Sequence, residues 1–148
     1  MIQTIRIENW HQNLTALINE RKEQPFAWGT NDCSLWAADC IVAVTGVDFA
    51  LNARGTYDTA IGAYKCIQSV YEVDNVKQIF EKLFGETVPQ FYARQGDIVY
   101  QDSNYEGFNA AVGVCNGEFS FFLHDPEDEE QGLFKIPTLS LDGCFRIG

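Results

Sequence analysis

Residues 26–36 read Phe-Ala-Trp-Gly-Thr-Asn-Asp-Cys-Ser-Leu-Trp and mark the start of the most apolar helix that the sequence predicts. Asn31 and Asp32 have the short polar side chains that suit a helix N-cap. The residues after them are apolar at helical spacing up to Gly46, and glycine suits the position that follows a helix. We therefore expect this helix to begin at residue 31 or 32 and to be the central helix of the fold.

The same stretch puts Cys33 in the first turn of the helix, directly after the capping pair. Unpaired backbone N–H groups and the partial positive charge at a helix start lower the pKa of a thiol and can bind a developing oxyanion. We therefore expect Cys33 to stand where a nucleophile would stand. The alternative is that Cys33 is simply a small buried residue at a helix start.

Helices are predicted in the first half of the chain and strands in the second. The helical segments are 10–22, which Pro25 ends, 31–46, 57–70 and 74–84. The strand segments are 98–100, 111–115, 118–123, 133–136 and 144–147, and Asn116-Gly117 is placed to make a tight hairpin. This order predicts an α+β fold in which N-terminal helices pack on a C-terminal antiparallel sheet.

The length of 148 residues and the apolar content of 46% fit one folded domain over residues 1–148. The formal net charge of −11, from 10 basic and 21 acidic residues, argues against a nucleic-acid partner and against anionic membrane surfaces. No signal peptide is predicted, and no apolar run is long enough to insert into a membrane. We expect the protein to be made and folded in a cytosol.

Five cysteines without a CxxC pair predict neither a disulfide framework nor a zinc site. We therefore expect reduced thiols, no metal and no cofactor. A metal or iron–sulfur centre would need several cysteines to converge, and the spacing of Cys33, Cys40, Cys66, Cys115 and Cys144 does not favour it. Cys40 is expected in the core, Asp39 either faces water or is buried with a partner, and the acidic run 125–130 is expected to be a solvated loop.

Three motifs, in this order, resemble the NlpC-like superfamily of papain-fold peptidases and amidases. Trp28-Gly29 leading into Asp32-Cys33-Ser34 is similar to the segment that opens the family's catalytic helix. Gly96-Asp97-Ile98-Val99 resembles the strand that opens its sheet, and Val112-Gly113-Val114 followed by Asn116-Gly117 resembles the next strand and its turn. The resemblance covers residues 26–123 and implies a papain-like NlpC-type fold.

The resemblance also implies a catalytic histidine immediately before Val112, but this position holds Ala111. A methyl group cannot accept a proton, and loss of the base removes several orders of magnitude of rate from such a site. Of the two histidines, His11 is expected at the surface. His124 lies near the place of the family's third, orienting residue; it is either a catalytic-site neighbour or a surface histidine.

A further resemblance is to short NlpC-like proteins of phage and prophage tail modules. It rests on residues 26–33, on Ala37-Ala38-Asp39 and on the ending Cys144-Phe-Arg-Ile-Gly. It implies a structural component of the tail tip, located in the virion after assembly in the host cytoplasm, with other tail-tip or hub proteins and peptidoglycan as partners. The alternative is an active cysteine peptidase or amidase that cleaves peptidoglycan stem peptides, with Cys33 as nucleophile and His124 or another group as base.

Overall fold

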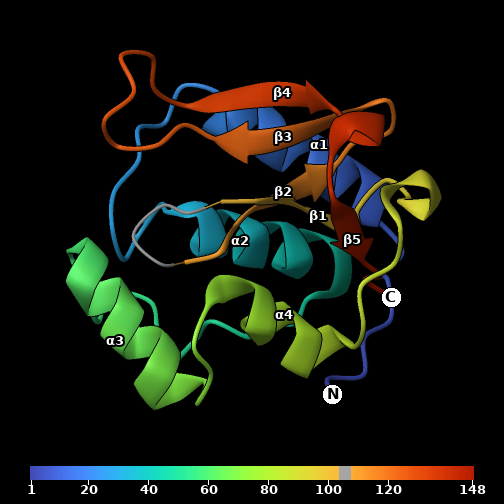
Figure 1. The fold of residues 1–148 in the computed structure, drawn as a ribbon. Coiled ribbons are helices and arrows are strands. Elements are labelled where there is room, and N and C mark those ends of the chain that lie inside the picture. The colour runs from blue at the N-terminus through green and yellow to red at the C-terminus, as the bar shows by residue number, and fades with distance from the viewer. Residues whose placement is uncertain (104–107) are drawn as a thin grey trace.

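A computed structural model describes residues 1–103 and 108–148, and within these ranges four α-helices accompany one antiparallel sheet of five strands (Figure 1). The helices are α1 (Trp10–Arg21), α2 (Cys33–Thr45), α3 (Ala60–Val70) and α4 (Val76–Phe84). The strands are β1 (Ile98–Asp102), β2 (Ala110–Cys115), β3 (Phe119–Leu123), β4 (Leu133–Pro137) and β5 (Gly143–Phe145). Short 3-10 helices, η1 (Gln90–Tyr92) and η3 (Thr138–Ser140), precede β1 and β5. The predicted α+β order is confirmed.

The strands lie in the order β4-β3-β2-β1-β5, so the C-terminal strand returns to the edge beside β1. The turn between β2 and β3 falls at Asn116-Gly117, as predicted. Gly117 has a φ of +97°, which favours glycine, and the Asn116 N–H donates to the Phe119 carbonyl at 3.0 Å. This local turn sets the pairing of Cys115 with Ser120.

Helix α2 lies beneath the sheet in Figure 1 and packs against β2. Most of its apolar residues are buried, among them Trp36, Ile41 and Val44, as is the predicted core residue Cys40. Gly46 ends the helix with a φ of +76° and donates its N–H to a carbonyl of the last turn. The prediction of a central apolar helix is therefore confirmed.

Two helices start later than predicted, because each predicted helix includes the residue that caps it. Helix α3 begins at Ala60 and not at residue 57, because the Thr59 hydroxyl accepts a hydrogen bond from the backbone N–H of Gly62. Helix α4 begins at Val76 because Asn75 caps it in the same way. The cap at Thr59 therefore leaves residues 57 and 58 in the loop before α3.

A second core lies on the sheet face away from α2. Its buried residues are Val99, Cys115, Phe122, Leu141 and Cys144. All five cysteines of the chain are free, and the described residues hold no cluster of three or more His, Cys, Asp or Glu side chains able to bind a metal ion. No helix among the described residues is both long and apolar enough to cross a membrane.

Asp39 is partly buried with two partners, which settles the alternatives left open by the sequence. Its carboxylate lies 2.7 Å from Arg21 of α1 and 2.8 Å from Arg54 of the loop after α2. Arg54 also pairs with Asp48 at 2.9 Å. The three segments are therefore joined through one carboxylate.

Asp97 joins both ends of the chain to the start of the sheet. Its side chain has no exposed surface and accepts hydrogen bonds from the Arg6 guanidinium at 3.1 Å, the Ile147 N–H at 3.0 Å and the Arg94 N–H at 2.9 Å. Arg6 continues to the Ile147 carbonyl at 2.9 Å. The Gly96-Asp97 motif therefore has a structural role at the chain termini.

Candidate functional site at the start of the central helix

Cys33 is the first residue of α2, and Asp32 caps the helix immediately before it. The Asp32 side chain is buried and accepts hydrogen bonds from the backbone N–H groups of Leu35 and Gly29, each at 3.0 Å, and from the Tyr57 hydroxyl at 2.6 Å. A buried carboxylate needs such partners. The predicted arrangement, with Cys33 at a helix start that packs against β2, is confirmed.

Gly29 lets the segment before α2 fold closely over a neighbouring loop. Its φ is +82°, and a β-carbon at this position would collide with the backbone oxygen of Tyr57. The Gly55 N–H donates to the Gly29 carbonyl at 2.9 Å. Gly29 therefore holds the loop that carries Tyr57 beside the cap of α2.

The ladder between β2 and β3 is short. Among the described residues the two strands pair near the hairpin only, at Val114↔Phe121 and Cys115↔Ser120. Before Val114 the ladder stops, although Gly113 still packs closely on the Phe121 backbone and the Phe122 ring.

Ala111 and Val112, on β2, line a cleft that Cys33 also lines. The backbone N–H of Val112 acts on the Cys33 thiol in the direction that lowers its pKa. Ala111, in the position where the resemblance implies a catalytic histidine, contributes only a methyl group and also packs on the second core. Neither of these two residues of β2 offers a side chain that could accept a proton from the thiol.

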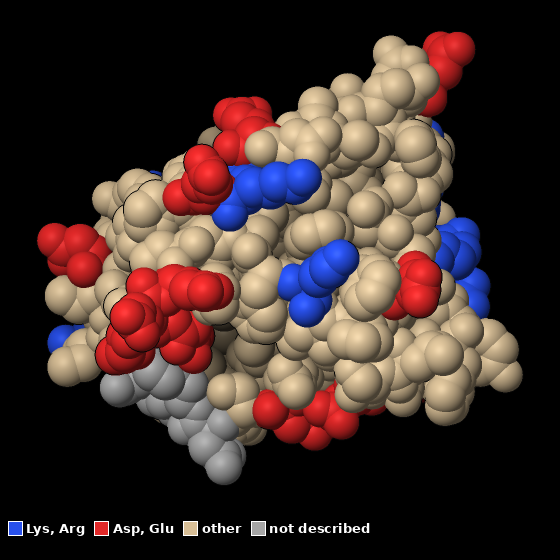
Figure 2. Space-filling model, turned by 90° about the horizontal axis from the view of Figure 1, so that it is seen from above, with Lys and Arg blue, Asp and Glu red and all other residues tan. Residues whose placement is uncertain are grey.

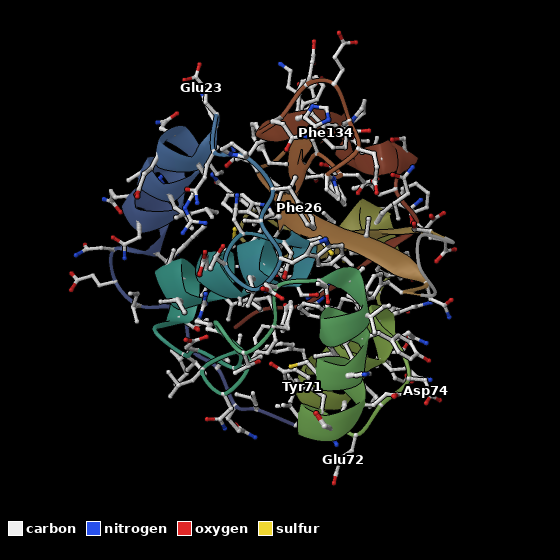
Figure 3. The ribbon with its side chains drawn as sticks, turned by 90° about the vertical axis from the view of Figure 1, so that its left-hand side faces the viewer. Glu23, Phe26, Tyr71, Glu72, Asp74 and Phe134 are labelled. Carbon is white, nitrogen blue, oxygen red and sulfur yellow. The ribbon has the colours of Figure 1, made fainter. Side chains whose placement is uncertain are left out.

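The cleft has mainly apolar walls and a volume of about 60 Å³. Three aromatic side chains form one wall: Trp28 stacks on Phe108 with ring centroids 5.8 Å apart, and Phe26 meets Trp28 edge-on at 4.7 Å. Phe26 lies near the centre of Figure 3, over the end of the molecule where α2 begins. Asp125, which is exposed, lines the cleft from the loop after β3.

The expectation of a lowered thiol pKa at Cys33 is wrong. Burial, followed by the neighbouring Asp32 carboxylate, raises the pKa of Cys33 to about 12. The Val112 N–H and the Ser34 hydroxyl act in the opposite direction but are outweighed. A helix start stabilises a thiolate only where desolvation and nearby carboxylates do not cost more. Cys33 is therefore a neutral thiol at physiological pH.

His124 is held by the acidic loop. Its Nδ1 lies 3.1 Å from the Asp128 carboxylate, its Nε2 lies 4.0 Å from Glu130, and its ring packs on Phe134 at 4.5 Å. His124 is not among the residues that line the cleft. His11 is exposed on α1.

The sequence interpretation missed Asp125 and Tyr57 as residues of the site. Asp125 belongs to the run 125–130, which does form a loop between β3 and β4 as predicted, but its first member lines the cleft. Partial burial, followed by the Asp128 and Glu127 carboxylates, raises the pKa of Asp125. The position of Asp125 two residues after the end of β3, a strand whose last residues line the cleft, was the only signal for it.

Tyr57→Phe is expected to lower the free energy of unfolding by about 1–3 kcal/mol, because the buried Asp32 carboxylate loses its only side-chain donor among the described residues. Urea unfolding followed by circular dichroism measures the change. Tyr64→Phe is the matched control, because Tyr64 packs on Phe108 and its hydroxyl makes no hydrogen bond within the described residues. Equal stabilities of the two variants would contradict the role of the Tyr57 hydroxyl.

The fold and the site define an α+β domain with a capped cysteine beside an apolar cleft. The chain belongs to the family DUF6950, a domain of unknown function, whose family model matches residues 5–147. No curated protein and no solved structure shows a significant match to the chain.

Proposed function

We propose that this chain is a degenerate relative of the NlpC-like cysteine hydrolases and serves as a structural component of a bacteriophage tail tip. The observation that carries the first part is the composition of the cleft: it holds a neutral thiol at a helix start, and Ala111 stands where the base is expected. General-base assistance contributes about 10²–10⁴-fold to such a reaction. A site whose described lining residues include no histidine, and whose thiol has a pKa of about 12, is poorly suited to nucleophilic catalysis.

The tail-tip part of the proposal is supported by the resemblance of residues 26–33 and of the C-terminal segment to tail-module proteins. The strongly acidic surface is compatible with assembly onto basic partner proteins. On the face shown in Figure 2, acidic side chains gather at several places around the margin. Other tail-tip or hub proteins are the proposed partners, and the proposed location is the virion after assembly in the host cytoplasm.

The alternative function is an active peptidase or amidase that cleaves peptidoglycan stem peptides with Cys33 as nucleophile. It would require a base to reach the thiol. His124 would have to leave its contacts with Asp128 and Phe134 to serve. The contacts of His124 therefore favour the proposal that the site is a degenerate hydrolase site.

The purified protein is expected to hydrolyse peptidoglycan stem peptides at a background rate, and Cys33→Ala is expected to change that rate little. Ala111→His should raise Cys33-dependent hydrolysis, because it places a base on the strand that lines the same cleft. Product formation is measured by liquid chromatography and mass spectrometry. Ala111→Gln, which adds bulk without a base, is the control.

Hydrolysis of stem peptides by the unchanged protein well above background, lost in Cys33→Ala, would overturn the proposal of a degenerate site and establish the alternative. The tail-tip assignment has a separate test. Mass spectrometry of purified virions from a host that carries the gene should find the protein in the tail fraction. Its absence from those particles would contradict a structural role in the tail.

A further inference from the structure

Residues 124–132 form a strap between β3 and β4 that runs beside the segment linking α1 to α2 (Figure 1). The base of the strap is fixed by backbone contacts. The His124 N–H donates to the Gly132 carbonyl at 2.9 Å, and the Leu133 N–H donates to the Lys22 carbonyl at 2.9 Å. Gly132 has a φ of +95°, and a β-carbon there would collide with the Lys22 carbonyl oxygen. The strap therefore starts and ends close against the segment that leads into α2.

One side chain, that of Gln131, joins the strap to the residues of the cleft. Its Oε1 accepts a hydrogen bond from the Phe26 N–H at 3.1 Å. Its Nε2 donates to the carbonyls of Asp125 at 3.0 Å and Asp128 at 2.9 Å. The opposite orientation of the amide would satisfy none of these three contacts. Phe26 and Asp125 both line the cleft, so Gln131 connects two of its walls.

The first residues of the strap also bear on the thiol. Burial, followed by the carboxylate of Asp32 and, to a smaller extent, that of Asp125, raises the pKa of Cys33. The Asp125 N–H donates to the Asp128 carboxylate at 3.0 Å, which folds this part of the strap back on itself. Displacement of the strap would take the Asp125 carboxylate away from the cleft that Cys33 lines and would admit water there.

We propose that the strap closes the cleft over Cys33 and that the three hydrogen bonds of Gln131 hold it closed. A segment held by a few hydrogen bonds opens at a lower free energy than the whole fold, because its opening exposes little buried apolar surface. The strap fits this description, since residues 125–130 are all exposed. The inference rests on the proposed function only in taking this cleft as the site. It adds that access to the thiol depends on whether Gln131 keeps its contacts.

The test compares alkylation of Cys33 by iodoacetamide in the unchanged full-length protein and in Gln131→Ala, with peptide mapping by mass spectrometry. Loss of the three hydrogen bonds favours the open strap, so Cys33 should react about tenfold faster in Gln131→Ala. Cys40 is fully buried in the same helix and should not react faster. Gln95→Ala is the matched control. Gln95 is also half-buried and donates to the Asn116 side chain at 2.8 Å, but it is not among the described residues that line the cleft.

Gln131→Glu is a second variant that alters the same contacts more conservatively. A glutamate retains an acceptor for the Phe26 N–H but cannot donate to the carbonyls of Asp125 and Asp128. It should therefore also speed the alkylation of Cys33. Hydrogen exchange gives an independent readout, because the Phe26 N–H loses its acceptor in Gln131→Ala and should exchange about tenfold faster.

Alkylation of Cys33 that is no faster in the two Gln131 variants than in Gln95→Ala would overturn the proposal. Equal acceleration at Cys40 would also overturn it, because the thiol would then become accessible by unpacking of the helix and not by opening of the strap. Alkylation reports access to Cys33 whether or not the site hydrolyses a substrate. Hydrolysis above background would overturn the proposed function and leave the strap unaffected, so the two proposals fail separately.

Discussion

Asp97→Ala is expected to lower the free energy of unfolding by about 3–5 kcal/mol, since it removes one partner of a buried ion pair and leaves the other without compensation. The Arg6 guanidinium would lose the carboxylate at 3.1 Å, and the Ile147 N–H would lose its acceptor. Typical domains have total stabilities of about 5–15 kcal/mol, so the loss should be large enough to shift the unfolding midpoint strongly. Urea unfolding measures it.

Glu86→Ala is the control for Asp97→Ala. It removes the same charge from an exposed side chain that makes no ion pair among the described residues, and it should change stability by about 0.5 kcal/mol or less. Asp97→Asn retains the size of the side chain, and its loss of unfolding free energy should lie between those of the other two variants. Hydrogen exchange at Ile147 should rise in both Asp97 variants. An Asp97→Ala protein as stable as Glu86→Ala would show that the carboxylate does not join the chain ends.

Alkylation of Cys33 by iodoacetamide at pH 7.5 is expected to be about 10²-fold slower than alkylation of an ordinary exposed cysteine. Raising the thiol pKa to about 12 leaves very little thiolate at this pH, and the greater nucleophilicity of a high-pKa thiolate recovers only part of the loss. Peptide mapping by mass spectrometry assigns the modified cysteine. The rate should continue to rise tenfold per pH unit up to pH 10.

The control for slow alkylation is the same protein unfolded in urea, in which Cys33 should react as an ordinary cysteine. The pH dependence separates poor access from a raised pKa, because restricted access lowers the rate without moving the pH at which it levels off. A rate that is already maximal near pH 6 would mean a thiolate stabilised as in an active hydrolase. That outcome would contradict both the raised pKa and the loss of nucleophilic function.

The start and end of α2 could be predicted from the sequence because the interactions that set them are local. The Asp32 side chain reaches the N–H of Leu35, three residues along, and Gly46 closes the helix with a carbonyl of its own last turn. The hairpin at Asn116-Gly117 is local in the same sense. In contrast, the predicted starts of α3 and α4 are wrong, because the predicted helices include the residues that cap them, Thr59 and Asn75.

The sequence by itself therefore determined the α+β class and the place of Cys33 at the first turn of the central helix. Only the tertiary structure decided the chemistry of the thiol, because the burial that raises the pKa of Cys33 depends on what packs around the helix start. It also decided which residue of the acidic loop reaches the cleft, Asp125 and not His124. The cleft brings together residues that are far apart in the chain, such as Cys33 and Asp125, and no local pattern of residue types encodes that.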